Sequence, residues 1–449
     1  MSVETPVNDF ISKYEKSGFA RFHMPGHKGR ILHGLENKDI TEIKGADYLY
    51  EADGIIDKSE ELTAGLFGAG KTLYSTEGSS LSIKTMLGII KSCRKDRENR
   101  MLVAAPRNVH KAFIDGCCLL DIDVAWVYPK QSSAQICSSS VTAEDIRRTI
   151  ENCDRIPDAV YITSPDYLGN MADIKGISRV CKKYGIPFLV DNAQGAYLKF
   201  LDRSLHPLDL GADMCVDSAH KTLPVYTGGG YLHISESAPQ QWICSAKEIM
   251  SLFASTSPSY LIMGSLDKCC GELQGGLPEK IRSCAFRVRK SADVIASFGW
   301  DVFNNEPLKL TIFSEKSGYS GDELAELLRK YKIECEYSDP SCVVLMCSPY
   351  NDEEDFQRLE SAFGEIPILS SKDICNIEDI PEAKVKMPIR EAYFSCHKRM
   401  PAEQAVGRIC TRAAVSCQPS IPVVVPGEEI TVEIMKILKR YSIFYVDVL

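Results

Sequence analysis

A serine, a histidine and a lysine lie within four positions of one another in DSAHKTLPVY, residues 217–226. The apolar run ADMCV comes directly before them, so we expect Ser218, His220 and Lys221 to follow the end of a buried strand. Burying a lysine is costly unless its chemistry is needed, and a desolvated amine can form a Schiff base. Lys221 is therefore either a solvated surface cation or a nucleophile.

A carboxylate and an imidazole also follow predicted strands. Asp191 ends the apolar segment IPFLV within VDNAQGAY (190–197), and His110 follows MLVAA within PRNVHKAF (106–113). Asp191 is either a turn residue that ends its strand or the partner of a protonated ring nitrogen in a cofactor. His110 is either a structural histidine or a ring that stacks on a flat aromatic cofactor.

The stretch STEGSSLSIKTML, residues 75–87, resembles a phosphate-binding helix start. Gly78, Ser79 and Ser80 precede an amphipathic segment, so backbone N–H groups and two hydroxyls can face an anion, although serine is also a common N-cap. Together, a Schiff-base lysine, an acid for a pyridine nitrogen, a phosphate cradle and a stacking ring are the requirements of pyridoxal phosphate. We therefore expect pyridoxal phosphate as the cofactor. We expect no metal centre, because the 18 cysteines include no CxxC pair.

Short apolar runs alternate with amphipathic stretches. Strands are predicted at 101–105, 123–128, 158–163, 186–191, 212–218 and 229–234, and helices at 80–95, 142–153 and 173–185. This alternation favours an α/β fold with a mostly parallel sheet covered by helices. Ligands of such sheets bind at the carboxyl ends of the strands, where the residues above are expected.

A change of pattern near Gly299 predicts a domain boundary. A helix-rich stretch at about 266–297 precedes it, and α+β segments follow, with strands expected at 307–314, 331–339 and 341–348. We expect an N-terminal arm at 1–20, a large cofactor-binding domain at 21–299 and a smaller α+β domain at 300–449.

Composition argues against several kinds of partner. The chain has 449 residues, of which 44% are hydrophobic and 25% charged, and its net charge is −9. This balance argues against nucleic acid as the main partner, and no apolar run reaches the roughly 18 residues of a membrane span. Scattered cysteines and the absence of a signal-peptide pattern indicate a cytoplasmic protein with reduced thiols.

Several segments resemble the ornithine/lysine/arginine decarboxylase family in its short bacterial form. RFHMPGHKGR (21–30) is similar to the family signature FHxPGHKGG and is the most specific match. Further matches that extend the resemblance over nearly the whole chain are DITEI (39–43), TSPDYLGNMADI (163–174), DSAHKTLP (217–224), STSPSYLIMGSLD (255–267), AVGRI (405–409) and IPVVVPGEEIT (421–431). The resemblance implies the aspartate-aminotransferase fold (pyridoxal-phosphate fold type I) and a homodimer.

The resemblance also implies roles for individual residues. Lys221 would bind the cofactor covalently, Asp191 would pair with its ring nitrogen, and His110 would stack on the ring. The other residues implied to contact the cofactor are Gly78, Ser79, Ser80, Gln194, Ser218 and His220. Histidine is usual in the family at Gln194 and Tyr197, and an asparagine-like residue is usual at Glu77. The Gln194 amide can still donate to a phenolic oxygen, although it does not titrate near neutral pH.

The segment STSPSY implies a shared active site. In the family it reaches the phosphate of the neighbouring subunit, so Ser255 or Thr256 would do so here. The alternative is that Ser257 and Pro258 form a turn that starts a helix, with Ser255 or Thr256 as its cap.

The implied reaction is decarboxylation of lysine, arginine or ornithine to its amine, with neither nucleic acid nor membrane as partner. Candidate acids for a cationic substrate side chain are Asp39, Glu42 and Asp166. Two alternatives are open. One is a different reaction on the same cofactor, such as amino-group transfer, in which the substrate carboxylate could be bound by Arg390, Arg399 or Arg408. The other is a cofactor-binding paralogue without catalysis.

Overall fold

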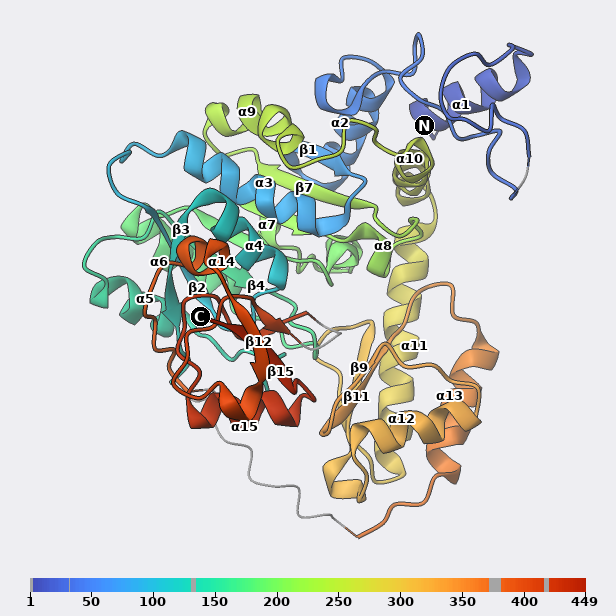
Figure 1. The fold of residues 1–449 in the computed structure, drawn as a ribbon. Coiled ribbons are helices and arrows are strands. Elements are labelled where there is room, and N and C mark those ends of the chain that lie inside the picture. The colour runs from blue at the N-terminus through green and yellow to red at the C-terminus, as the bar shows by residue number, and fades with distance from the viewer. Residues whose placement is uncertain (1–2, 32, 131–134, 371–380, 416–419) are drawn as a thin grey trace. The chain divides into compact units, whose positions relative to one another are not determined.

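A computed structural model describes residues 3–31, 33–130, 135–370, 381–415 and 420–449 (Figure 1). The chain divides into two compact units, each built from two stretches of sequence. The first unit comprises Met1–Asn99 and Cys181–Glu279, and the second comprises Arg100–Val180 and Lys280–Leu449. The sequence-based division at residues 20 and 299 stays a prediction.

The first unit contains strands in the order β1-β7-β6-β5. β5 and β6 are parallel, whereas β7 is antiparallel to both β6 and β1. The strands are β1 (Ala69–Ser75), β5 (Phe188–Asp191), β6 (Met214–Asp217) and β7 (Gly230–Ser235), and the helices are α1 (Pro6–Lys16), η1 (Leu49–Glu51), α2 (Ile55–Phe67), α3 (Gly78–Cys93), η2 (Ala196–Phe200), α7 (Pro207–Leu210), α8 (Ala219–Thr222), α9 (Gln240–Ser251) and α10 (Tyr260–Gln274). Helix α3 packs on β7 and α9, and α2 packs on β1.

The second unit contains three parallel strands in the order β4-β2-β3, a four-stranded antiparallel sheet β10-β11-β9-β8, and the pairs β12–β15 and β13–β14. The strands are β2 (Met101–Pro106), β3 (Ile122–Val127), β4 (Ala159–Thr163), β8 (Asp301–Phe303), β9 (Lys309–Phe313), β10 (Tyr337–Ser338), β11 (Cys342–Met346), β12 (Lys398–Pro401), β13 (Ala414–Val415), β14 (Pro422–Val424) and β15 (Tyr445–Val448). The helices are α4 (Lys111–Leu120), α5 (Ala143–Asn152), η3 (Glu315–Ser317), α12 (Gly321–Lys330), α13 (Glu353–Glu365), α14 (Ile389–Phe394), η4 (Ala402–Gln404) and α15 (Val432–Arg440). The boundaries between the units fall within α6 (Ile174–Tyr184) and α11 (Leu277–Ser297).

The local signals explain most of these elements. All six predicted strands of the α/β region and its three predicted helices are confirmed. Thr142 starts α5 with a capping box, in which its hydroxyl accepts from the Asp145 amide while the Asp145 carboxylate accepts from the Thr142 amide. The strand expected at 331–339 is wrong except for β10. Lys332 there adopts a left-handed conformation (φ +60°), and the Ile333 amide donates back to Leu328, so this segment closes α12 instead.

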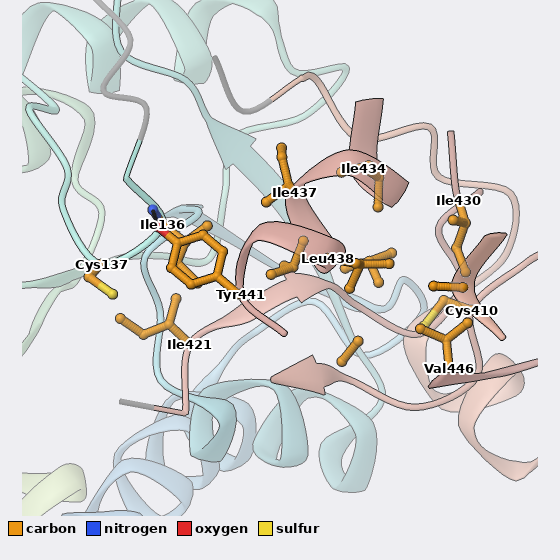
Figure 2. Packing of buried hydrophobic residues seen from close by; sticks show 14 of the residues in the cluster. Ile136, Cys137, Cys410, Ile421, Ile430, Ile434, Ile437, Leu438, Tyr441 and Val446 are labelled. Atoms are coloured by element: carbon orange, nitrogen blue, oxygen red, sulfur yellow. Dashed lines mark hydrogen bonds between the residues drawn. The ribbon is translucent and has the colours of Figure 1, made fainter. Parts of the chain in front are cut away.

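A cluster of buried hydrophobic residues forms the core below α15 in the second unit (Figure 2). Ile434, Ile437 and Leu438 of α15 belong to this cluster, together with Val446 of β15 and Cys410. Ile437 and Leu438 follow Ile434 by three and four residues, which places all three on one face of an amphipathic helix, so the sequence pattern alone predicts which face of α15 is buried. Among the described residues, no helix is long and apolar enough to cross a membrane.

Substituting Leu438→Ala should destabilise the protein by about 2–5 kcal/mol, because Leu438 is completely buried and its removal leaves a cavity in the cluster. Val432→Ala on the same helix is the control, since Val432 is 47% exposed. Urea unfolding of both variants checks the prediction. Equal midpoints for the two would show that α15 does not pack as described.

Candidate functional site

The predicted nucleophile lies immediately after β6. Ser218 is almost fully buried, and Lys221 is half-buried in the one-turn helix α8. The Lys221 amide donates to the Ser218 carbonyl at 3.0 Å, which fixes the lysine within one turn of the strand end. The buried strand β6 and the short turn of α8 therefore hold Lys221 at the carboxyl end of β6.

The predicted phosphate cradle forms the first turn of α3. Gly78 has φ +68°, a left-handed conformation that glycine adopts without strain. Ser79 is buried and Ser80 half-buried in the next two positions. The Ser218 hydroxyl donates to the Ser79 hydroxyl at 2.9 Å. The structure thus brings the start of α3 and the end of β6 together, although 139 positions separate these serines in the chain.

The three glycines at 228–230 make this contact possible. A Cβ on Gly230 would lie 2.9 Å from the Asp217 carbonyl oxygen and 3.4 Å from the Ser79 nitrogen. The Gly78 amide donates to the Gly228 carbonyl at 2.7 Å, so the glycine segment also holds the start of α3. A side chain at Gly230 would push β7 away from both β6 and α3.

The predicted acid ends β5, which is parallel to β6. Asp191 is 2% exposed, and its Oδ1 accepts from the Ala193 amide at 3.1 Å. Gln194 is also buried, and its Oε1 is enclosed without a hydrogen-bond partner among the described residues. Tyr197 is completely buried. Asp191 and Gln194 therefore lie at the same end of the paired strands as Ser218.

His220 is oriented by the glycine segment. Its Nδ1 donates to the Gly229 carbonyl at 2.8 Å, which leaves Nε2 for a ligand. Burial lowers the pKa of His220, and the neighbouring Lys221 charge acts in the same direction. His220 is therefore a neutral hydrogen-bonding group near pH 7.

His110 lies in the second unit, where it caps α4. Its Nδ1 accepts from the Ala112 amide at 3.1 Å. This cap fixes the ring at the carboxyl end of β2, and its stacking on a cofactor stays a prediction.

The STSPSY segment is held by its own chain. Ser255 and Thr256 are exposed, and the Glu77 carboxylate accepts from the Ser255 amide at 2.8 Å. Glu77 is thus a link between the phosphate cradle and this segment. Ser259 caps α10, so the alternative that Ser255 or Thr256 is the cap is wrong. Pro258 follows the exposed stretch and is itself buried, which leaves both hydroxyls outside the helix.

The three candidate acids for a substrate cation differ in their burial and in the hydrogen bonds that their oxygens already accept. Asp166 is buried, and its two oxygens accept from the amides of Ser139, Leu168 and Asn170 and from the Asn170 side chain, so it organises a loop. Asp39 is partly exposed beside His27, 3.3 Å away, and Glu42 is half-buried. The three arginines considered for aminotransfer are exposed in the second unit: Arg390, Arg399 and Arg408.

One group of residues was missed by sequence reasoning. Asp217, His206 and His233 are completely buried together behind Ser218, and Asn192 donates to Asp217. Asp217 stands inside the quoted DSAHK motif, which is the one local signal that could have pointed to it. The histidines come from a loop and from β7, and spacing along the chain does not predict that they meet.

Substituting Gly230→Ala should destabilise the first unit by about 1–3 kcal/mol, because the added methyl group meets backbone atoms on both sides. Gly276→Ala is the matched control, since a Cβ there meets nothing within 4 Å. Thermal unfolding of the two variants provides the comparison. A Gly230→Ala protein as stable as the control would contradict the close approach of β7 to α3.

Comparisons with known proteins extend this description. The family described as Orn/Lys/Arg decarboxylase, major domain, matches residues 5–284. An arginine decarboxylase of Bacillus subtilis is 28% identical over 96% of this chain and 92% of its own length. An arginine decarboxylase of Bacillus anthracis is 28% identical over 97% of this chain and 93% of its own.

Solved structures share the fold. The Francisella novicida lysine decarboxylase covers 100% of this chain and 81% of its own with a TM-score of 0.80 at 18% identity. The constitutive lysine decarboxylase of E. coli covers 100% and 82% with a TM-score of 0.78 at 17% identity. The predicted α/β fold of the aspartate-aminotransferase type is therefore confirmed. Because the family match spans more than half of the sequence, this chain belongs to the ornithine/lysine/arginine decarboxylase family and is an enzyme of that family.

Proposed function

We propose that the protein is a cytoplasmic, pyridoxal-phosphate-dependent enzyme that decarboxylates a basic amino acid to its amine. The observation that supports this most directly is the 2.9 Å hydrogen bond between the hydroxyls of Ser218 and Ser79. It joins the helix start where a phosphate would bind to the strand end from which Lys221 extends.

The side chains at this edge of the first unit fit the cofactor. The start of α3, a helix of 16 residues, offers backbone N–H groups and the Ser79 and Ser80 hydroxyls to a phosphate. The enclosed Gln194 Oε1 lacks a partner among the described residues, and such an atom is costly to bury unless a ligand or water satisfies it. Since an amide can rotate, Gln194 can present either its oxygen or its NH₂ group to the cofactor.

Each residue then has a distinct task. Bound pyridoxal phosphate supplies an acceptor for the electron pair left on the substrate when CO₂ departs. Asp191 keeps the pyridine nitrogen protonated, because a neighbouring carboxylate favours the charged form of a base. Lys221 binds the cofactor covalently, and Nε2 of His220 binds its phosphate together with Ser79 and Ser218. His110 stacks on the ring.

A basic substrate is supported by the family and by its named members. The two Bacillus relatives reported above are named arginine decarboxylases, which favours arginine over lysine and ornithine. Since the oxygens of Asp166 are already engaged, Asp39 and Glu42 are the better candidates to face the substrate cation. The exposed Ser255 and Thr256 fit a role in a homodimer, in which Thr256 reaches the phosphate bound by the partner subunit.

Borohydride reduction of the cofactor-loaded protein, followed by peptide mass mapping, should place the cofactor on Lys221. Incubation with arginine, lysine and ornithine should release CO₂ and the amine from at least one of them. Lys221→Ala should abolish both results, whereas the exposed-lysine control Lys268→Ala should retain both.

Other products would contradict the proposal in different ways. A keto acid in place of the amine would indicate aminotransfer. Cofactor uptake without turnover of any basic amino acid would indicate a non-catalytic paralogue. An adduct on a different lysine would remove Lys221 from the site.

A further inference from the structure

Three ionisable side chains meet in the interior of the first unit, directly behind the strand end that carries Ser218. His206, Asp217 and His233 have no exposed surface. His206 Nε2 donates to Asp217 Oδ2 at 3.1 Å, and His233 Nε2 lies 3.3 Å from the same oxygen. The ring of Phe67 stacks on His233 with centroids 4.3 Å apart, which closes the cluster on that side.

The Asp217 carboxyl group is ionised in spite of its burial. Burial by itself raises the pKa of this group, but the two histidines outweigh that effect and hold the pKa of Asp217 well below its usual value. Burial lowers the pKa of His233 despite its contact with Asp217. A buried anion of this kind is tolerated only when several donors surround it.

Asn192 provides the donor on the opposite side of the carboxylate. Its Nδ2 donates to Asp217 Oδ1 at 2.6 Å, and its backbone N–H donates to the Val216 carbonyl at 2.9 Å. Asn192 directly follows Asp191, and Asp217 directly precedes Ser218. One carboxylate therefore links the end of β5, which carries the predicted acid, to the end of β6, which leads to Lys221.

The cluster also has the arrangement of a metal site, with ligand atoms of its three residues within 4.8 Å of one another. Hydrogen bonds, however, already engage both carboxylate oxygens of Asp217. His233 Nδ1 bonds with the Thr72 hydroxyl at 2.8 Å. Three other atoms of the cluster have no hydrogen-bond partner among the described residues: His206 Nδ1, His233 Nε2 and Asn192 Oδ1. His233 Nε2 contacts Asp217 Oδ2 as an ion pair at 3.3 Å.

We propose that Asp217 is a positioning residue of the cofactor site, whose buried carboxylate, held by His206, His233 and Asn192, keeps the ends of β5 and β6 in register. The inference rests on the proposed cofactor function of Lys221. It assigns Asp217 no contact with substrate or cofactor. Asp217 acts through its neighbours, by fixing where Asp191, Ser218 and Lys221 stand relative to one another.

The test compares Asp217→Asn and Asn192→Ala with the wild-type protein. Asp217→Asn replaces an acceptor with an amide that faces existing donors, and Asn192→Ala removes the cross-link while it keeps the charge. Titration of the cofactor-free proteins with pyridoxal phosphate should give dissociation constants raised by about 10- to 100-fold, the range for partners that orient a binding group. In the loaded enzymes, kcat should fall more than KM rises.

A second buried pair in the same unit provides the control. Asn8 Nδ2 donates to the buried Asp267 at 2.8 Å, on α1 and α10, away from the β5 and β6 ends. Asp267→Asn and Asn8→Ala should lower the melting temperature but change the dissociation constant of the cofactor by less than about twofold. If Asp217→Asn fails to fold, the test is the dissociation constant of the cofactor in Asn192→Ala, compared with that in Asn8→Ala.

Three results would overturn the inference. The first is a dissociation constant equal to that of the wild type in Asn192→Ala and in any folded Asp217→Asn protein, while borohydride still labels Lys221. In that case the proposed cofactor function holds, but the positioning role of Asp217 does not. The second is stoichiometric metal that survives dialysis and depends on Asp217, because Asp217 would then be a ligand. The third is a wild-type protein that takes up no pyridoxal phosphate, which would overturn the proposed function as well.

Discussion

The close approach of β6, β7 and the start of α3 is the constraint on which the candidate site depends. Gly230 leaves no space for a side chain between the Asp217 carbonyl and the Ser79 amide nitrogen. Because backbone lies against backbone here, the Ser218 hydroxyl reaches Ser79 directly. An anion at the start of α3 would therefore lie at the strand end that leads to Lys221. A wider gap would separate the phosphate cradle from the lysine.

Behind this contact, a polar interior sets the position of the strand ends. Backbone hydrogen bonds set the distance between β5 and β6, and a network of buried side-chain hydrogen bonds further restricts where the strand ends lie. Asp217 is the centre of such a network, because Asn192 and His206 donate hydrogen bonds to different oxygens of its buried carboxylate. The energetic cost of burying the charge is offset by these donors, and the cluster lies next to the residues whose placement matters most for chemistry.

Sequence reasoning succeeded where the signal is local. The strand that ends at Asp191 and the strands that precede Lys221 and His110 are almost continuously apolar, and the helices between the strands are amphipathic. Their positions were therefore predicted within a few residues. β1 was missed because AGKTLYS mixes glycine and lysine with apolar residues. Its pairing with β7 depends on a segment 161 positions away, as in the contact between Thr72 and His233.

The missed parts of the site share this non-local origin. Asp217 pairs across the sheet with Tyr231, and this register brings His233 to the same buried region. The alternative that Ser255 or Thr256 caps α10 was wrong because several serines precede this helix, and only the backbone geometry identifies Ser259 as the cap. An asparagine-like residue is usual in the family at Glu77, and the sequence did not predict that the Glu77 carboxylate accepts a hydrogen bond from the Ser255 amide.

The most direct measurement is a crystal structure of the protein with pyridoxal phosphate bound. The account predicts that phosphate oxygens lie within about 3.0 Å of the Ser79 and Ser218 hydroxyls. It also predicts a covalent bond between the cofactor and Lys221 Nζ, with the pyridine nitrogen at the Asp191 carboxylate. A phosphate bound away from the start of α3, or a cofactor attached elsewhere with Ser79 and Ser218 still in contact, would contradict it.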